Sequence, residues 1–235
     1  MKISIIHILA IMLLSHAAQA QTIIVPGTSD PWLAGMPDGS IDPAAGGYPA
    51  STAPGQSPVL VSGISISPGA AYSFSGSGAT GNDPIMPQYG LDGNLNDIAP
   101  HAAGAQNGIA GLTAPVDALI GIFLGPGEPD LGVTPPALDF TSSASRVYLT
   151  LYPALQQPFF IGDGLTSQAV IQQVVAPAGA TRLYLGTMDG VDWSNNTGAF
   201  TVEVEVVPEP GVASLASISL LSLWCCRRRH SKRPA

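Results

Sequence analysis

The segment MDGVDWSNNTG, residues 188–198, concentrates side chains that end in oxygen. Its carboxylate, hydroxyl and amide groups belong to Asp189, Asp192, Ser194, Asn195, Asn196 and Thr197. Ca²⁺ takes about six to eight oxygen ligands of mixed kinds, so this composition favours a partial Ca²⁺ site. The alternative is that Asp, Asn, Ser and Gly fill a turn for conformational reasons alone. Residues 195–197 also match the Asn-x-Ser/Thr pattern of glycosylation acceptors.

Strands on both sides are expected to position this segment. In residues 199–207 the apolar side chains alternate with Thr201, Glu203 and Glu205, which is typical of a strand with one face in a core and one in water. Residues 182–187 predict a second strand, so the oxygen-rich segment is expected at the tip of a hairpin. Further predicted strands are 117–124, 146–152, 158–161 and 169–176.

The rest of the body also favours strands and turns. VLVSGISI and AYSFSGSG, separated by Pro68-Gly69, predict a hairpin. Residues 21–57 are rich in Pro, Gly, Ser and Ala without a sustained period, which predicts an extended leader or a flexible linker. No long window shows capped helical periodicity. The sequence therefore predicts an all-β fold, an antiparallel β-sandwich over residues 58–207 or a barrel-like relative of it.

Several segments in order resemble the calcium-dependent galactose-binding lectins of the PA-I type. They are ISISPGAAYSFSGSG, NGIAGLTAPVDALIGIFLG, QQVVAPAGATRLYLGTMDG, and the Asn-Asn-x-Gly-x-Phe-x-Val pattern from Asn195 to Val202. The resemblance covers about residues 58–207, with insertions around 82–105 and 125–155. It implies a lectin-like β-sandwich of the jelly-roll type, in which Ca²⁺ coordinates two hydroxyls of a sugar.

The resemblance also implies a set of metal ligands. Asp189, Asn195 and Asn196 would bind Ca²⁺ through their side chains, and a main-chain carbonyl near Trp193 would add a fourth ligand. Another carbonyl would come from the loop after Gly78, at Thr80 or Gly81. The segment from Asp189 to Asn195 is one residue shorter than in these lectins.

The sugar-contacting His-Pro-Asp-Gln pattern of these lectins is not reproduced. Asn107 falls at the position of the Gln, and His101 lies a few residues from the position of the His. The alternative prediction is that His101 is a solvated loop residue. Trp193 has two interpretations: an exposed ring that stacks on a sugar, or a ring that covers the core beneath the hairpin.

Other polar groups give weaker signals. LDGNLNDIA spaces Asp92, Asn94 and Asn96 like half of an EF-hand loop, but it lacks the Gly and the distal Glu, so we predict a solvated loop. Motifs of nucleophilic, metal-dependent and phosphate-transferring enzymes are missing, and the body has no Cys. We therefore predict that the protein is not an enzyme.

The charge distribution separates the two ends from the body. Residues 21–206 contain two basic and fifteen acidic residues, a formal charge of −13, which disfavours nucleic acid as a partner. At the start, Lys2, an apolar run over residues 5–14, and Ala18-Gln19-Ala20 predict a signal peptide over residues 1–20.

The C-terminal segment, residues 208–235, contains three signals in order. Pro208, Glu209 and Pro210 precede a chargeless run over residues 211–226, which predicts a short transmembrane helix. A basic cluster with Arg227, Arg228 and Arg229 follows, as the positive-inside rule requires. This order resembles the PEP-CTERM sorting signal, which implies processing by an exosortase. A plain membrane anchor is the alternative.

These observations together predict an exported protein of the cell surface or extracellular matrix. It would be held in the membrane through its C-terminal helix until processing and would bind extracellular polysaccharide or another glycan through a Ca²⁺ site. The alternative is a non-catalytic structural protein of the matrix or surface, with a lectin-like fold and no working sugar site.

Overall fold

The computed structural model describes residues 19–43, 45–82 and 88–208. Residues Gln19–Val207 form one compact unit. The predicted transmembrane helix, the basic cluster, Glu209 and Pro210 lie outside the described residues, as does almost all of the predicted signal peptide. Within the described ranges, no helix has the length and apolar character needed to cross a membrane.

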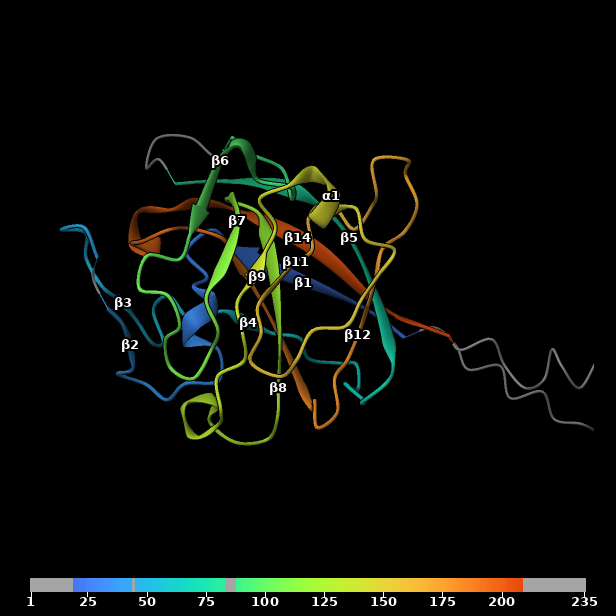
Figure 1. Ribbon diagram of the computed structural model, residues 1–235, viewed down its shortest axis with the longest axis horizontal. Coiled ribbons are helices and arrows are strands. Elements are labelled where there is room, and N and C mark those ends of the chain that lie inside the picture. Colours follow the sequence, from blue (N-terminus) through green and yellow to red (C-terminus); the bar gives the residue numbers. More distant parts are fainter. Residues whose placement is uncertain (1–18, 44, 83–87, 209–235) are drawn as a thin grey trace, which may run out of the picture. The chain divides into compact units, whose positions relative to one another are not determined.

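The fold is all-β, as predicted (Figure 1). Its largest sheet has five strands. The order is β1-β14-β5-β12-β10. The bounds are Ala20–Pro26 for β1, Ala71–Gly81 for β5, Thr150–Leu151 for β10, Gln173–Val175 for β12 and Thr197–Val207 for β14. β14 pairs with β5 along its whole length and with β1 on its other side. The predicted alternation is confirmed, because Phe200, Val202 and Val204 are buried while Glu203 and Glu205 are exposed.

A second sheet has the strand order β11-β8-β13-β4. Its strands are β4 (Val59–Leu60), β8 (Leu119–Leu124), β11 (Phe159–Phe160) and β13 (Arg182–Thr187). Every residue of β8 is buried, which explains why its sequence LIGIFL shows no alternation.

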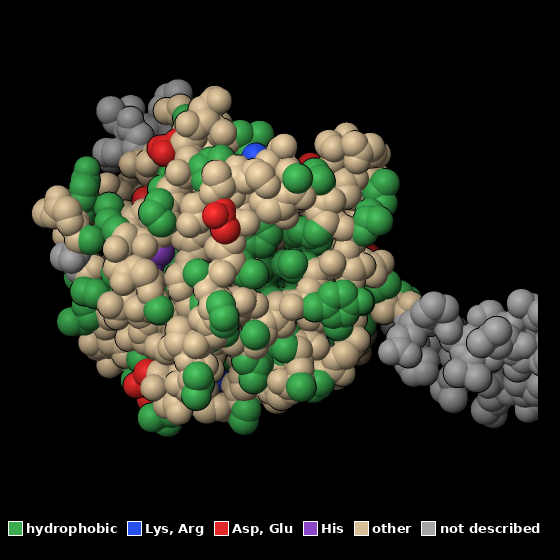
Figure 2. Space-filling view, in the orientation of Figure 1, with side chains coloured by type: hydrophobic (Ala, Val, Ile, Leu, Met, Phe, Trp, Pro, Cys, Tyr) green, Lys and Arg blue, Asp and Glu red, His purple; other side chains and the backbone are tan. Residues whose placement is uncertain are grey.

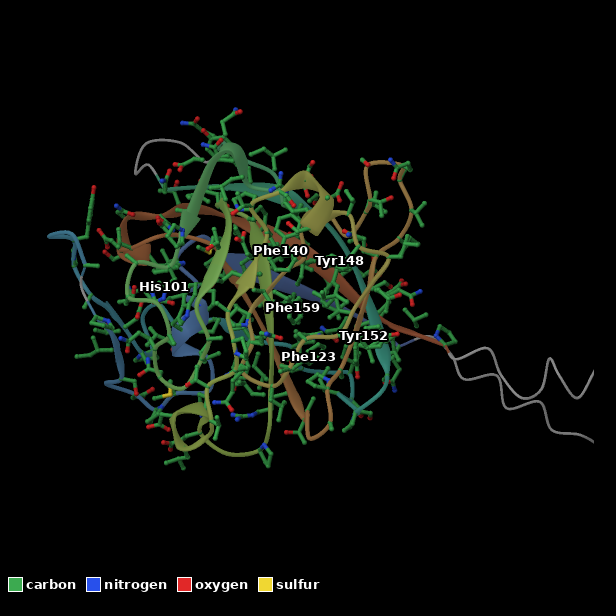
Figure 3. All side chains as sticks on the ribbon, in the orientation of Figure 1. His101, Phe123, Phe140, Tyr148, Tyr152 and Phe159 are labelled. Carbon is green, nitrogen blue, oxygen red and sulfur yellow. The ribbon has the colours of Figure 1, made fainter. Side chains whose placement is uncertain are left out.

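The two sheets share one hydrophobic core. Tyr72 of β5 packs against Phe123 of β8 with 5.8 Å between ring centroids, and Phe123 stacks on Phe159 at 5.4 Å. Figure 3 shows Phe123 and Phe159 close together in the interior, and His101 well apart from them. Among the residues that the structure describes, this core is formed by side chains of the compact unit.

Smaller elements complete the unit. A three-stranded sheet has the order β6-β7-β9, and β2 pairs with β3. Their bounds are Ile41–Asp42 for β2, Ser51–Thr52 for β3, Asn94–Pro100 for β6, Leu112–Val116 for β7 and Leu138–Asp139 for β9. The short helices are η1 (Pro31–Leu33), η2 (Pro129–Leu131), α1 (Ser143–Arg146) and η3 (Trp193–Asn195).

Two predicted hairpins are wrong. Pro68-Gly69 does form a turn, in which the N–H of Ala70 donates to the carbonyl of Ser67, but β4 before it belongs to one sheet and β5 after it to the other. β13 and β14 likewise belong to different sheets. The oxygen-rich segment is therefore a connection between the sheets, and its two ends are held by different neighbours.

The predicted leader is also wrong, because residues 21–57 are part of the domain. β1 supplies an edge strand with seven residue pairs to β14, and Trp32 and Leu33 are buried in the core. The predicted strand 146–152 shrinks to β10 after α1. The pairing is not purely antiparallel, since β10 and β12 run parallel, as do β7 and β9.

Candidate functional site

Asp189 is held at the end of β13 by the turn that follows it. Its carboxylate is almost completely buried, and Oδ1 accepts the N–H of Gly190 at 2.6 Å and the N–H of Val191 at 3.4 Å. Asp192 adopts a left-handed conformation with φ 58° and caps η3, where its Oδ1 accepts the N–H of Ser194. The two acids therefore fix the path of the segment through local hydrogen bonds.

Trp193 covers the core and does not face solvent. Its side chain is fully buried, Nε1–H donates to the carbonyl of Thr187 at 2.9 Å, and its ring lies 5.6 Å from that of Trp32. The interpretation as a core residue is confirmed, and the prediction of a sugar-stacking ring is wrong. Its own carbonyl accepts the N–H of Asn196 at 3.3 Å, which leaves one lone pair for a ligand.

Asn195 and Asn196 both present an oxygen that has no partner. The Oδ1 atoms of the two amides are buried and accept no hydrogen bond. Asn196 is oriented from its other end, because Nδ2 donates to the carbonyl of Gly27 at 3.2 Å, directly after β1. Buried acceptors without a donor are uncommon in native proteins and often mark the place of a water or an ion.

Asp117 joins this site, although the sequence did not suggest it as a ligand. It is only 1% exposed, and neither carboxylate oxygen has a hydrogen-bond partner. Its N–H donates to the carbonyl of Met188 at 2.7 Å, and the N–H of Met188 donates to Ala118 at 2.9 Å, so Asp117 lies beside Asp189. The hydroxyl of Thr80 donates to the carbonyl of Asp117 at 3.0 Å and holds it there.

The two buried acids of the site, Asp117 and Asp189, both have raised pKa values. Burial, followed by the charges of Asp189 and Asp97, raises the pKa of Asp117 to about 7, although the nearby backbone N–H of Asn82 acts in the opposite direction. Burial also raises the pKa of Asp189 to about 6, partly offset by a hydrogen bond from Asn196. A cation at this place would offset the negative charges of the carboxylates and would be coordinated by the unpaired oxygens.

The donor set fits Ca²⁺ better than a transition metal. Two carboxylates and two amide oxygens are hard ligands, and together they would supply a charge of −2. Within the part of the chain that the structure describes, no three His, Cys, Asp or Glu side chains gather in a way that would hold a metal ion. Any ion here would therefore depend on the amides of Asn195 and Asn196 as much as on the acids.

Thr80 is not suited to be the predicted carbonyl ligand. It lies inside β5, and its carbonyl accepts the N–H groups of both Gln88 at 3.1 Å and Tyr89 at 3.0 Å. Both lone pairs of this oxygen are therefore in use. Its hydroxyl instead positions Asp117. The other predicted carbonyl, that of Gly81, accepts the hydroxyl of Thr197 at 3.4 Å.

The predicted sugar contact His101 is internal, and the predicted sugar contact Asn107 is partly buried. His101 is buried, with Nε2 2.9 Å from Oδ2 of Asp42 and Nδ1 2.6 Å from the carbonyl of Gly104, and its ring stacks on Trp32 at 3.6 Å. Asn107 donates from Nδ2 to the carbonyls of Trp32 at 2.9 Å and Ile41 at 3.2 Å. For His101, both the predicted sugar contact and the predicted solvated position are wrong, because it is buried. The two residues instead fasten the segment after β1 to the body, and the sugar contact of Asn107 stays a prediction.

We expect Asn107→Ala to destabilise the protein by about 1–3 kcal/mol in chemical denaturation. It removes two hydrogen bonds and leaves a β-carbon at a positive φ of 50°. Asn107→Gly is the matched control, because it loses the same bonds without the backbone strain and should cost less. Equal stability of all three proteins would contradict the fastening role of Asn107.

The second acidic cluster is solvated only in part, since Asn96 and Asp97 are exposed but lie in a strand. Residues 94–97 belong to β6, and Asp92 is half-buried, with Oδ1 accepting the N–H of Asp163 at 3.0 Å. Burial raises the pKa of Asp92. This acid therefore helps to build the opposite loop instead of facing water.

One sequence signal would have found Asp117. It is the only charged residue between His101 and Glu128, and it directly precedes a continuous apolar run. An acid at the end of a fully buried strand requires a partner. Asp117 lies inside the predicted strand 117–124, so the pattern of that strand did not indicate this requirement.

The comparisons with known proteins add no relative. No protein-family model matches the chain, and no curated protein matches it.

Proposed function

We propose that the protein is exported to the cell surface or extracellular matrix and binds Ca²⁺ with Asp117, Asp189, Asn195 and Asn196. The observation that supports this most is the set of four buried oxygens without partners on Asp117, Asn195 and Asn196, beside the raised pKa of Asp189. Such a cluster costs stability unless a cation or protons occupy it. The finer fold proposal is a lectin-like β-sandwich of the jelly-roll type, formed by the two large sheets.

We further propose that the ion serves carbohydrate binding. A bound Ca²⁺ would offer open coordination positions to pairs of sugar hydroxyls, as the resemblance to the PA-I type lectins implies. The chain's own residues would orient the ion, since Asn196 is anchored to Gly27 and Asp117 to Met188. No residue is given a catalytic role in this proposal.

The second candidate is a structural protein of the matrix or surface without a working sugar site. The specific observation in its favour is that Trp193, His101 and Asn107 all make internal contacts. The ion would then only stabilise the connection between the sheets.

A glycan array separates the two candidates. Binding that appears with Ca²⁺, disappears with chelator and is absent in Asp189→Ala would support the lectin function. Asp38→Asn is the control, because this acid is exposed and lies outside the site. Calcium binding without any glycan binding would support the structural role instead.

We propose that Pro208, Glu209 and Pro210 direct sorting and that an exosortase-type protease processes the chain near them. Mass spectrometry of the mature protein is expected to show a C-terminus close to this motif, without Arg227, Arg228 and Arg229. A mature protein that keeps these arginines would argue for plain anchoring in the membrane. Replacing Glu209 by Gln should reduce processing if the motif is what the protease recognises.

A further inference from the structure

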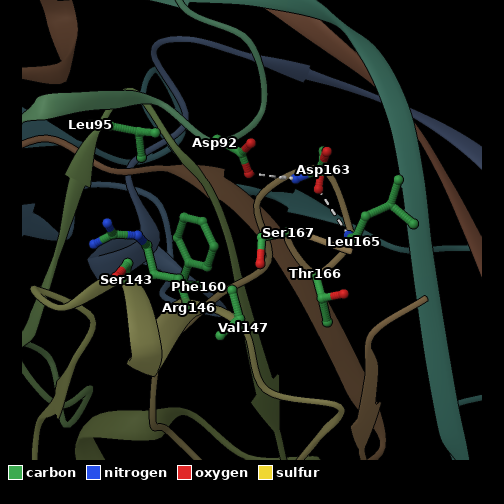
Figure 4. Close-up of a pocket in the computed structure, with 10 residues that line it drawn as sticks. All are labelled: Asp92, Leu95, Ser143, Arg146, Val147, Phe160, Asp163, Leu165, Thr166 and Ser167. Carbon is green, nitrogen blue, oxygen red and sulfur yellow. Dashed lines mark hydrogen bonds between the residues drawn. The ribbon is translucent and has the colours of Figure 1, made fainter. Parts of the chain in front are cut away.

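A pocket of about 240 Å³ lies outside the proposed Ca²⁺ site (Figure 4). Its wall is formed by Asp92 before β6, by α1 with Arg146, by Phe160 of β11, and by the segment that includes Asp163 and Leu165. Figure 4 shows the ring of Phe160 in the middle of these side chains, with Asp92 and Asp163 on one side and Arg146 on another. We call it the Asp92 pocket. Its volume is below the roughly 300–1,000 Å³ of pockets for drug-sized ligands, which suits a single small ring.

The carboxylates of Asp92 and Asp163 in the Asp92 pocket are each held by a hydrogen bond to one oxygen. The other oxygen of each remains as an acceptor. Oδ1 of Asp92 accepts the N–H of Asp163 at 3.0 Å, and Oδ1 of Asp163 accepts the N–H of Leu165 at 2.8 Å. The second oxygen of each carboxylate can accept a hydrogen bond from a ligand. The close approach requires Gly162, because a β-carbon there would lie 2.4 Å from Oδ1 of Asp92. The pocket is therefore pre-organised to receive hydroxyl or amine donors.

The remaining wall is apolar and partly exposed. Leu95, Val147 and Leu165 are 53%, 37% and 39% exposed, and they surround the buried ring of Phe160. Figure 2 shows that much of this face of the molecule carries hydrophobic side chains, with few charges among them. Exposed apolar groups beside fixed carboxylates suit a ligand that has both C–H faces and hydroxyl edges.

The charge of the Asp92 pocket disfavours one class of ligand, the anions. Arg146 is the only cation of the Asp92 pocket, and one nitrogen of its guanidinium already donates to the carbonyls of Phe140 at 2.6 Å and Thr141 at 2.9 Å. Two acids against one arginine, on a body with a formal charge of −13, disfavour an anionic ligand. A neutral sugar has the required donors and no opposing charge.

A second hollow of about 200 Å³ shares one lining residue with the first. It lies on the outer face of the five-stranded sheet, between Leu165 and Ile171 on one side and Ser73, Ser75, Glu203 and Glu205 on the other. Leu165 lines both hollows. The lining of this hollow resembles that of the Asp92 pocket, because carboxylates and hydroxyls again lie beside aliphatic side chains. We call this the Glu203 pocket.

We propose that the Asp92 and Glu203 pockets are adjacent subsites for a neutral glycan chain and bind it without Ca²⁺. This inference rests on the proposed carbohydrate-binding function and deepens it, since it names neutral sugars as the ligand class and a second place of binding. Asp92 and Asp163 would accept hydroxyl donors in the first subsite, and Glu203 and Glu205 in the second. Leu165 would contact the C–H groups of both sugar units.

Saturation-transfer NMR on the full-length chain tests this inference. The probes are neutral trisaccharides of glucose, galactose and mannose, each measured with chelator and with Ca²⁺, and trigalacturonic acid is the anionic counterpart. We expect at least one neutral trisaccharide to bind in chelator, and Asp92→Asn to weaken it about tenfold through loss of a charge-assisted hydrogen bond. Asn keeps the oxygen that accepts the Asp163 N–H, so the loop should stay folded. Glu203→Gln, on the exposed face of the sheet, should independently weaken binding of the same trisaccharide.

The controls distinguish this inference from the proposed function. Asp130→Asn, an exposed acid outside both pockets, should leave binding unchanged. Neutral-sugar binding that vanishes with chelator and is unaffected by Asp92→Asn would overturn the two subsites and leave the Ca²⁺ proposal standing. Binding in chelator that requires Asp92 would support the subsites even if Asp189→Ala changes nothing. Preference for trigalacturonic acid, or no signal from any neutral probe in chelator, would overturn the inference.

Discussion

Asp117→Asn is expected to stabilise the calcium-free protein at pH 8 by about 1–3 kcal/mol. In the folded protein the pKa of Asp117 is raised from 3.8 to about 7, so ionisation at pH 8 opposes folding. Each pKa unit corresponds to about 1.4 kcal/mol, and part of that gain is lost because the new amide is also buried without partners. Thermal unfolding in chelator measures the effect as a rise of several degrees in the midpoint.

The same variant is expected to lose the stabilisation that Ca²⁺ gives to the unmutated protein. Asn removes one of the two negative charges that the ion requires. Asp38→Asn serves as the matched control, since this exposed acid should change neither midpoint. A destabilised Asp117→Asn protein that still responds fully to Ca²⁺ would contradict the assignment of Asp117 to the site.

The calcium-free protein is also expected to become less stable between pH 5 and pH 8, by about 2–4 kcal/mol. Asp117 and Asp189 have folded pKa values of about 7 and 6, well above their ordinary value of 3.8. The folded state therefore binds protons more tightly than the unfolded state, and stability is lost as pH rises through these values. The raised pKa of Asp30, caused by its burial and the charge of Asp42, acts in the same direction.

Calcium is expected to remove most of this loss, because the ion competes with protons for the same carboxylates. Thermal midpoints at pH 5, 6, 7 and 8, each in chelator and in millimolar Ca²⁺, measure the two curves. They should converge at low pH and separate at high pH. Stability that rises toward pH 8 in chelator would contradict the buried acid pair.

Local periodicity predicted the positions of strands that have one solvent-exposed face. It predicted less well which strands pair with each other. β14 alternates between core and water, and β13 begins and ends where its sequence indicates, because each pattern reports the burial of its own side chains. The partner of a strand depends on distant residues. VLVSGISI and AYSFSGSG look like a hairpin, but β4 pairs with β13 and β5 pairs with β14.

Composition was misleading for residues 21–57. Their Pro and Gly content predicts a linker, yet the alternating burial of β1 and the buried ring of Trp32 make them part of the core. A strand of seven residues that joins a sheet edge gives only a weak local signal among so many turn residues. The contacts of His101 and Asn107 that hold this segment join residues far apart in the chain, so the sequence did not predict them.

The candidate site was predicted in part. Asp189, Asn195 and Asn196 lie close together in sequence, so their residue types suggested an oxygen-rich site, and the resemblance to the PA-I type lectins implied that these three are ligands. Asp117 is brought beside Asp189 by the backbone hydrogen bonds of Asp117 and Ala118 with Met188, which continue the pairing of β8 with β13. Whether a polar residue such as His101 faces a ligand or an internal partner depends on packing, which the spacing of polar residues does not report.

Calorimetric titration of the purified protein with Ca²⁺ tests the central claim most directly. We predict saturable binding of one ion per chain at pH 7, with release of protons from Asp117, and no binding heat in Asp189→Ala or Asp117→Asn. Asp38→Asn should titrate like the unmutated protein. Absence of heat from the unmutated protein, or equal binding by all four proteins, would contradict the proposed Ca²⁺ site.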